Sequence, residues 1–226
     1  MPKPAAGHFE TVCHPPASGG PAGKLVVLLH GYGADMHDLI GLAPHWAGLM
    51  PDVEFLSPNA PEPCAGYPIG RQWFPVGSLD IEEMHAGVLD AAPRLDAFLD
   101  AELEKRGLTE RDLALVGFSQ GTMMALHVGL RRSHPPAGIL GFSGVLVGAE
   151  TLAEEIRVRP PVFLVHGAAD PMIPVQALTM TENALRAAGV PVKSHVSQGL
   201  GHGIDAAGLA LGGRFLAEIL GTPADG

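Results

Sequence analysis

The sequence predicts an α/β fold in which a mostly parallel sheet is covered by helices on both faces, a doubly wound arrangement. Short, continuously apolar runs occur at residues 24–30, 113–118, 137–143 and 161–166. Such runs are typical of parallel strands that are buried on both faces. Stretches of helical length separate these runs, so strand and helix alternate along the chain. The 226 residues contain no internal repeat and suffice for one sizeable core, so we expect a single domain over residues 1–226.

The first quarter of the chain is rich in turn-forming residues. Residues 1–23 contain many Pro, Gly and Ala and are expected to form an N-terminal edge segment. The predicted elements here are an edge strand at 9–12, strands at 24–30 and 53–57, and a helix over 36–49. Asp35 is expected to cap that helix, and Pro44 to kink it or start a new turn.

Residues 58–80 form the longest stretch without a regular pattern. Five prolines and three glycines interrupt residues 58–78, so no regular element is expected there. Loops of this length inside a compact domain are usually functional. Ile69, Trp73 and Phe74, with Met172 from a later loop, are therefore candidate walls of a substrate pocket. Packing of Trp73 and Phe74 into the core is an equally good interpretation.

The remaining elements follow the same alternation. Amphipathic residues 81–105 contain Pro93, which predicts a broken pair of helices ending at Gly107. The later predicted elements are a turn at 109–111, strands at 113–118, 137–143, 161–166 and 190–196, and helices at 120–132, 150–156, 175–188 and 205–220. No inserted cap domain is apparent between them, so a site at the carboxyl ends of the strands is expected to be fairly open.

The motif Gly-Phe-Ser-Gln-Gly at residues 117–121 joins an apolar strand to a helix. Its glycines permit a turn too tight for a Cβ, which would raise the hydroxyl of Ser119 above the carboxyl edge of the sheet. The backbone N–H of Gln120 would lie at the N-terminus of the helix, where an anion is favoured. Ser119 is the candidate nucleophile and Gln120 a candidate oxyanion donor. The alternative is an ordinary glycine-rich turn with a surface serine.

A second glycine loop, His-Gly-Tyr-Gly at residues 30–33, follows the first buried strand. A flexible loop at the carboxyl end of such a strand is well placed to present a backbone N–H to an oxyanion. We expect Tyr32 to be this second donor. A plain turn between strand and helix is the competing interpretation.

A serine hydroxyl needs a contacting base, and the base needs an acid that orients it. Asp170 follows the strand at 161–166, and His202 lies in a glycine loop after the last strand, so Ser119, Asp170 and His202 occur in the order nucleophile, acid, base. Most other histidines fall within predicted helices or at strand ends, where a structural hydrogen bond is expected. For Asp170 the alternative role is a cap or turn.

Composition excludes several classes of function. The formal net charge is −10 and no extended basic run occurs, which argues against nucleic-acid binding. No apolar stretch approaches 18 residues and the first residues lack the apolar middle of a signal peptide, so we expect a cytoplasmic protein without an integral membrane segment. Cys13 and Cys64 are far apart and are expected to be reduced thiols. No motif for a metal or another cofactor occurs.

Taken together, these motifs resemble the phospholipase/carboxylesterase family of α/β-hydrolases, which includes the acyl-protein thioesterases. The matching segments are Leu-His-Gly-Tyr-Gly-Ala-Asp at 29–35, Pro-Asn-Ala-Pro at 58–61, Trp-Phe at 73–74, Gly-Phe-Ser-Gln-Gly at 117–121, His-Gly-Ala-Ala-Asp-Pro-Met-Ile-Pro at 166–174 and Gly-His at 201–202. They span nearly the whole chain. The resemblance implies a minimal α/β-hydrolase core without a cap domain.

The resemblance also implies the roles of five residues: Ser119 as nucleophile, His202 as base, Asp170 as acid, and Tyr32 and Gln120 as oxyanion donors. Two departures concern substrate contacts. Pro75 follows Trp73-Phe74 where family members often carry Asp, and Met36-His37 replaces a small polar pair common in bacterial relatives. The sequence does not determine the oligomeric state, and the resemblance allows a homodimer.

We therefore expect a serine carboxylesterase that hydrolyses esters of small to medium acyl chain through an acyl-enzyme. A lysophospholipase or acyl-protein thioesterase acting on long acyl chains is the alternative within the class. A catalytically idle hydrolase fold that only binds a ligand is the alternative from another class. A metal-dependent hydrolase is a weaker alternative, because no His-Glu-x-x-His motif occurs.

Overall fold

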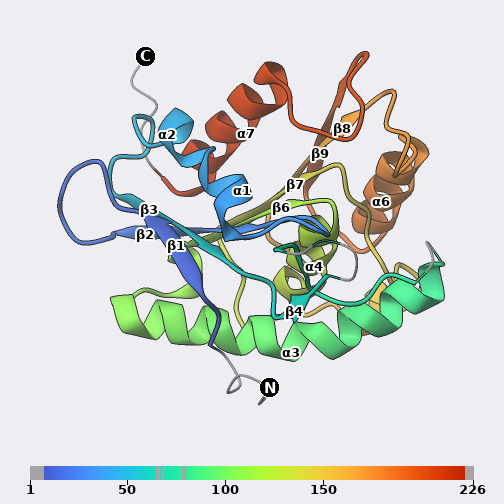
Figure 1. The fold of residues 1–226 in the computed structure, drawn as a ribbon, viewed down its shortest axis with the longest axis horizontal. Helices are drawn as coiled ribbons and strands as arrows, with labels where there is room; N and C mark the ends of the chain where they lie inside the picture. The colour runs from blue at the N-terminus through green and yellow to red at the C-terminus, as the bar shows by residue number, and fades with distance from the viewer. Residues whose placement is uncertain (1–7, 65–66, 68, 78–79, 222–226) are drawn as a thin grey trace.

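The computed structural model describes residues 8–64, 67, 69–77 and 80–221 (Figure 1). Its main sheet has seven strands in the spatial order β1, β3, β2, β6, β7, β8, β9. Their bounds are β1 Thr11–His14, β2 Lys24–Leu29, β3 Val53–Pro58, β6 Leu113–Phe118, β7 Gly138–Phe142, β8 Val162–Gly167 and β9 Val192–Ser197. Only β1 is antiparallel to its neighbour, so the predicted mostly parallel sheet is confirmed.

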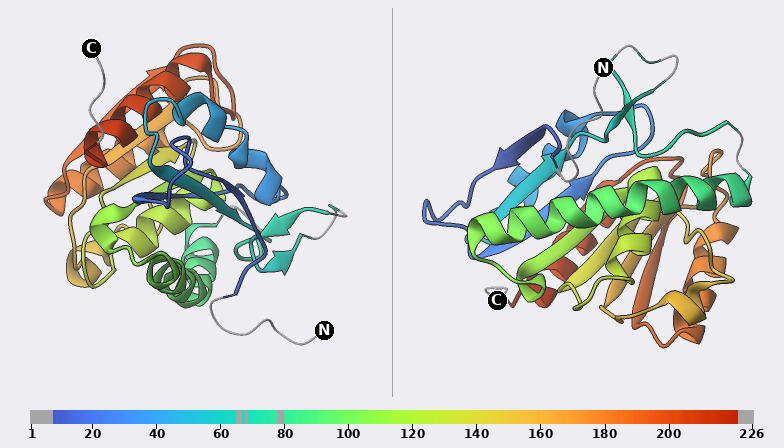
Figure 2. Two further views of the ribbon diagram at one scale, coloured as in Figure 1. Left: turned by 90° about the vertical axis from the view of Figure 1, so that its left-hand side faces the viewer. Right: turned by 90° about the horizontal axis from the view of Figure 1, so that it is seen from below.

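Helices cover both faces of this sheet (Figure 2). One face carries α1 Met36–Ile40, α2 Ala43–Trp46 and α7 Ala206–Ile219. The other carries α3 Ile81–Arg106, α4 Gln120–Gly129, the short α5 Leu152–Glu155 and α6 Gln176–Ala187. Within the described ranges no further helical domain is inserted between the strands. The expected doubly wound core without a cap is the observed arrangement.

Alternation of side chains along the central strands explains their continuous apolar pattern. In β2, Leu25, Val27 and Leu29 belong to the core on the α3 side. The intervening Val26 and Leu28 belong to the core on the α7 side. A strand that is buried on both faces needs an apolar residue at every position, which is the pattern that predicted it.

The predicted break in the helix at Pro93 is wrong, because α3 runs unbroken for 26 residues. Pro93 lies on the exposed side of the helix, and the carbonyl that its missing N–H would have bonded belongs to Leu89, which is 48% exposed. The buried residues Ala91 and Leu95 continue the apolar stripe past it. Packing of that stripe therefore outweighs the lost hydrogen bond. The helix ends at Gly107 in the left-handed conformation, as predicted.

Two other predictions need correction. Residues 58–80 are not entirely irregular, because β4 Glu62–Pro63 and β5 Arg71–Gln72 form a small antiparallel pair. The Cys64 N–H donates to the Gly70 carbonyl at 2.8 Å and closes this pair. The helix expected at 36–49 is divided into two short helices, α1 and α2, the second of which ends at Trp46. Asp35 caps the first and Pro44 lies in the first turn of the second, both as predicted.

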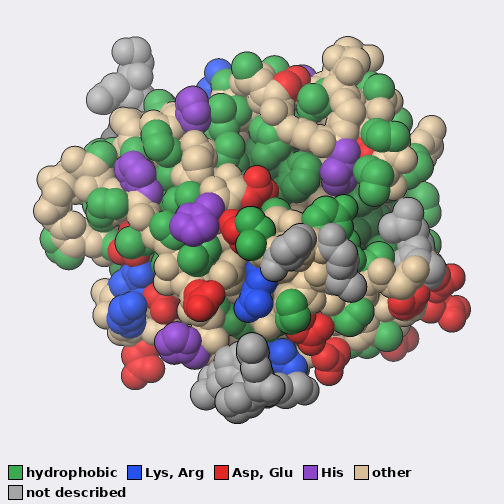
Figure 3. Space-filling model, in the orientation of Figure 1, with side chains coloured by type: hydrophobic (Ala, Val, Ile, Leu, Met, Phe, Trp, Pro, Cys, Tyr) green, Lys and Arg blue, Asp and Glu red, His purple; other side chains and the backbone are tan. Residues whose placement is uncertain are grey.

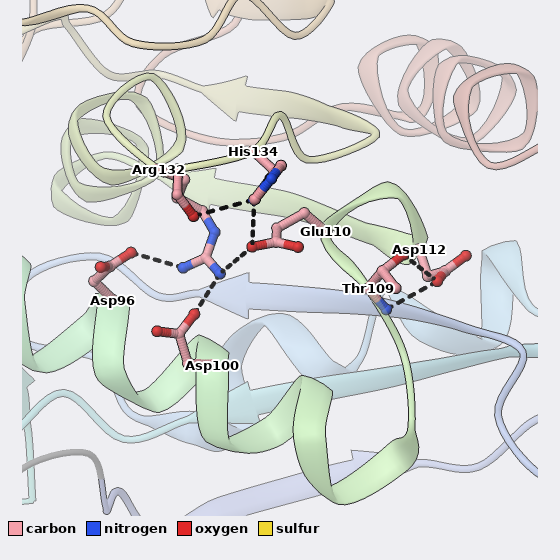
Figure 4. Close-up of polar contacts among 8 residues, drawn as sticks. Asp96, Asp100, Thr109, Glu110, Asp112, Arg132 and His134 are labelled. Carbon is pink, nitrogen blue, oxygen red and sulfur yellow. Dashed lines mark hydrogen bonds and ion pairs between the residues drawn. The ribbon is translucent and has the colours of Figure 1, made fainter.

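A buried arginine fastens the C-terminal end of α4 to α3 (Figure 4). The Arg132 guanidinium lies 2.6 Å from a carboxylate oxygen of both Asp96 and Asp100, and 3.6 Å from Glu110. Glu110 belongs to the short 3₁₀ helix η1 Glu110–Asp112, which follows α3 and leads into β6. Three carboxylates compensate the one buried cation, so the network holds the elements that precede and follow Ser119 together.

No helix among the described residues is both long enough and apolar enough to cross a membrane.

Candidate active site

Ser119 lies in the sharp turn between β6 and α4. Its backbone φ is +53°, a strained value for a residue with a side chain, and its N–H donates to the Phe142 carbonyl of β7 at 2.9 Å. A Cβ on Gly121 would overlap the Leu29 carbonyl of β2, and one on Gly117 would overlap Gly121 itself. Only glycine fits at these two positions, so the motif forms the tight turn that the sequence predicts.

Asp170 and His202 contact each other at the same edge of the sheet. Asp170 follows β8, His202 follows β9, and the His202 Nδ1 lies 2.8 Å from Asp170 Oδ2. The other carboxylate oxygen, Oδ1, accepts the N–H groups of Met172 and Ile173 at 2.8 and 2.9 Å. This arrangement holds the imidazole with Nδ1 as donor and Nε2 free to accept a proton.

The electrostatics of Asp170 favour its ionised form. Burial on its own would raise the pKa of this carboxyl, but the Ile173 N–H, the His202 ring and the Met172 N–H together hold the pKa below its usual value. The carboxylate is therefore charged at neutral pH and accepts the His202 Nδ1–H. The buried His166 lies behind it, with Nε2 at 2.8 Å from the Ile173 carbonyl and 3.4 Å from Asp170 Oδ2.

The His202 loop is packed against the turn that carries Ser119. The His202 ring lies 4.9 Å, centroid to centroid, from the ring of Phe118. The Ser143 hydroxyl donates to the Gly203 carbonyl at 3.3 Å and so fastens the loop to the end of β7. No hydrogen bond joins Ser119 and His202 in the described part of the chain. Catalytic hydrogen bonds of this kind often tighten only when substrate binds.

The two predicted oxyanion donors flank Ser119. A Cβ built on Gly31, the residue before Tyr32, would lie 3.4 Å from the Ser119 Cβ. Across the described ranges, neither the Tyr32 nor the Gln120 backbone N–H donates to another protein group. The side chain of Tyr32 points to another partner: its hydroxyl is hydrogen-bonded to the Cys64 thiol, and this bond raises the pKa of the phenol. Two free N–H groups beside a serine suit a developing negative charge on oxygen.

The side chain of Gln120 has a second role that sequence reasoning did not find. It is 2% exposed, its Oε1 accepts the Trp73 N–H at 2.9 Å and its Nε2 donates to the Phe74 carbonyl at 2.8 Å. The side chains of Trp73 and Phe74 are themselves only 2% exposed and pack in the core on the α3 side. Their packing in the core agrees with the second of the two interpretations given to them, and their part in a pocket wall stays a prediction.

The other two predicted pocket residues, Ile69 and Met172, are exposed by 81% and 56%. A cavity of about 170 Å³ lies instead between α3, α6 and the loop that follows β7. Its lining is Ile81, Met84, residues 145–150, Met180 and Thr181, and is mostly apolar. None of the four predicted pocket residues is among them. Gly144, the residue before this lining, packs against the Thr122 side chain and the Ser119 carbonyl, because a Cβ built on it would overlap the Thr122 Cβ and lie 2.9 Å from the Ser119 oxygen.

Ser143 and His166 are further residues of the site that the sequence did not single out for it. Ser143 has a φ of +45° and is 1% exposed, and His166 is equally buried. Both stand at the carboxyl end of a parallel strand, as Ser119, Asp170 and His202 do. Position at that edge is the signal that could have found them.

Charge on the surface does not favour a polyanionic partner. On the face drawn in Figure 3, Lys and Arg side chains lie singly or in small groups among Asp, Glu and His side chains. The formal net charge of −10 would repel a phosphate backbone.

Comparison with known proteins extends over most of the chain. A sequence model of the family described as phospholipase/carboxylesterase matches residues 14–220. The esterase YpfH of Escherichia coli (strain K12) is 31% identical over 186 residues, which are 82% of this chain and 78% of the relative. Acyl-protein thioesterase 1 of Neurospora crassa is 28% identical over 217 residues, 88% of each chain. The crystal structure of esterase PE8 superposes with a TM-score of 0.90 at 44% identity, covering 94% of this chain and 99% of that one.

Proposed function

Because the chain belongs to the phospholipase/carboxylesterase family and is a carboxylic ester hydrolase, we propose that it works as a serine esterase through Ser119, His202 and Asp170. The observation that carries the proposal is the 2.8 Å hydrogen bond between His202 and Asp170 beside the strained turn of Ser119. These residues come from three separate loops, and a fold that only bound a ligand would not need them at one edge of the sheet.

In the proposed mechanism, the Ser119 oxygen attacks the ester carbonyl while His202 Nε2 accepts the hydroxyl proton. The oxyanion that forms accepts the N–H groups of Tyr32 and Gln120. His202 then protonates the leaving alcohol, and an acyl-enzyme remains on Ser119. Water attacks the acyl carbon as its proton passes to His202, and that proton returns to Ser119 as the free acid leaves. The ionised Asp170 stabilises the imidazolium in both steps.

We propose an acyl group of small to medium length. The apolar cavity lined by residues 145–150, α3 and α6 has a volume of about 170 Å³. An acyl chain of a few carbons fits such a space. The similarity to acyl-protein thioesterase 1 of Neurospora crassa supports a second candidate, hydrolysis of long-chain thioesters, in which the chain would extend beyond the cavity over the exposed Met180.

Replacement of the nucleophile tests the assignment. Ser119→Ala should abolish hydrolysis of aryl esters, lowering kcat by a factor of about 10⁶, and should abolish labelling by a fluorophosphonate. Ser133→Ala is the matched control, because Ser133 is exposed and, among the described residues, its hydroxyl is hydrogen-bonded only to the neighbouring His134. Retention of wild-type turnover by Ser119→Ala would exclude the mechanism. An unlabelled wild-type protein without turnover would instead favour a binding protein.

A series of aryl esters from two to sixteen carbons separates the two substrate classes. We expect kcat/KM to peak at about two to six carbons, because longer chains exceed the cavity. A continued rise toward long chains would favour the thioesterase candidate.

We also propose that the protein is cytoplasmic. Cys13 and Cys64 form no disulfide in the structure, and the exposed Cys13 suits a reducing compartment. Formation of a homodimer stays a prediction, and sedimentation velocity at micromolar concentrations tests it.

A further inference from the structure

Trp73 makes two hydrogen bonds that lead to the two sides of the oxyanion hole. Its backbone N–H donates to the side chain of Gln120, the residue whose own N–H is one proposed donor, at 2.9 Å. Its indole Nε1–H donates to the His30 carbonyl at 2.9 Å. His30 stands two residues before Tyr32, the other proposed donor. Trp73 thus bridges two segments that are far apart in sequence, because its backbone N–H binds the strand-to-helix turn and its indole N–H binds the glycine loop.

His30 extends this connection to the glycine loop. Its ring is fully buried, and burial lowers its pKa, so the imidazole is neutral at pH 7. Nδ1 donates to the Gly31 carbonyl at 2.8 Å, and Nε2 accepts the Ala60 N–H at 3.0 Å. The peptide that joins Gly31 to Tyr32 carries this carbonyl at one side and the Tyr32 N–H at the other. A bond that fixes the carbonyl therefore fixes the direction of the N–H.

We infer that Trp73 is a positioning residue that sets the separation and direction of the two oxyanion donors, through Gln120 on one side and His30 on the other. The inference rests on the proposed function. All three side chains are at most 2% exposed, so water does not replace a lost bond readily. Donors aimed at the oxyanion act mainly on the transition state, and a displacement of the order of 1 Å can cost about 100-fold in rate.

The chain offers a matched pair of substitutions for the test, because it contains only two tryptophans. Trp46 is also buried, and its Nε1–H also donates to a backbone carbonyl, that of Leu209, at 3.0 Å. It lies in the other core, against α7. Trp73→Phe and Trp46→Phe therefore remove the same indole hydrogen bond and a similar volume, and both should lower the melting temperature by roughly 5 °C. Only Trp73→Phe breaks the bridge.

The readouts are kcat, KM and the Ki of a trifluoromethyl ketone that matches the acyl group of the substrate. This probe accepts the Ser119 oxygen at its carbonyl carbon and forms an oxyanion like that of the transition state. We expect Trp73→Phe to lower kcat about 10- to 100-fold and to raise the Ki by a similar factor, with KM within about twofold. Trp46→Phe should leave all three unchanged. A purely structural role for Trp73 would give the two variants the same kinetics.

Gln120→Met provides a second variant should Trp73→Phe not fold. It keeps the backbone N–H of residue 120 and the length of the side chain but removes both bonds to the loop, so the same loss of kcat and of probe affinity is expected. Wild-type kcat and Ki in the folded Trp73→Phe or Gln120→Met protein would overturn the inference. If Ser119→Ala is inactive at the same time, the proposed function stands without it. An active Ser119→Ala protein would instead overturn the proposed function.

Discussion

At the scale of single residues, the hydrogen bonds of Asp170 determine how His202 can act. One carboxylate oxygen is occupied by two backbone N–H groups, and the other faces His202 Nδ1. An amide in place of the carboxylate would keep the first pair of bonds but would turn an N–H₂ group toward Nδ1. The imidazole would then carry its proton on Nε2, the atom that accepts the Ser119 proton in the proposed mechanism.

We therefore expect Asp170→Asn to lower kcat by about 10³- to 10⁴-fold with little change in the fold. Steady-state hydrolysis of an aryl ester and far-UV circular dichroism measure the two effects. Asp90→Asn, on the exposed side of α3, is the control and should retain full activity. A loss of less than tenfold in Asp170→Asn would contradict the role proposed for this carboxylate.

Gly121 shows how strictly a single position can be constrained. Its Cα packs on the backbone of β2, so the methyl group of Gly121→Ala would overlap the Leu29 carbonyl. We expect this variant to lose more than about 3 kcal/mol of unfolding free energy or to be recovered only in insoluble form. Gly48→Ala, whose Cβ would meet nothing within 4 Å, should stay within about 0.5 kcal/mol of the wild type in urea unfolding.

At the scale of elements, the contact between α3 and α4 contains a buried histidine. His127 of α4 is 3% exposed, and its pKa is lowered to about 4, chiefly by burial and then by the nearby Arg131 and by His85 of α3. Glu155 acts in the opposite direction. The unfolded chain binds a proton at His127 below about pH 6.5, whereas the native protein does so only near pH 4.

Folding stability should therefore fall as the pH drops from 6.5 to 4, because in this range the unfolded state binds more protons than the native state. A shift of about 2.5 pKa units corresponds to about 3 kcal/mol at 1.36 kcal/mol per unit. His127→Leu should flatten the curve of unfolding free energy against pH by roughly this amount, as measured by urea unfolding at several pH values. Parallel curves for the two proteins would contradict the prediction.

At the scale of the whole molecule, one sheet is shared by two apolar cores. Trp73 belongs to the core on the α3 side and Trp46 to the core on the α7 side. Every central strand contributes side chains to both, so neither core can open without exposing the other. We propose that residues 1–226 form a single domain that unfolds as one unit.

The two single-tryptophan variants test this proposal, because each leaves one reporter on one face. In Trp46→Phe the fluorescence of Trp73 should follow the same urea transition as far-UV circular dichroism, and the reverse variant should do likewise. Separate midpoints for fluorescence and circular dichroism in either variant would indicate that the two faces unfold independently.

The sequence by itself determined the features that local chemistry controls. Apolar residues at every position specified the central strands, glycines specified the turn around Ser119, and Asp35 and Gly107 specified helix ends. Each signal involves residues within a few positions of one another. The order of Ser119, Asp170 and His202 along the chain, each after a predicted strand, then allowed the three to be proposed together.

Only the tertiary structure decided what depends on partners distant in sequence. Continuation of α3 through Pro93 depends on an apolar stripe that packs on the rest of the core. Trp73 is buried, and its backbone N–H donates to the side chain of Gln120, which lies 47 residues away in the sequence. Such contacts leave no periodic trace in the sequence, because the free energy that selects them comes from burial after the chain has folded rather than from local conformational preference.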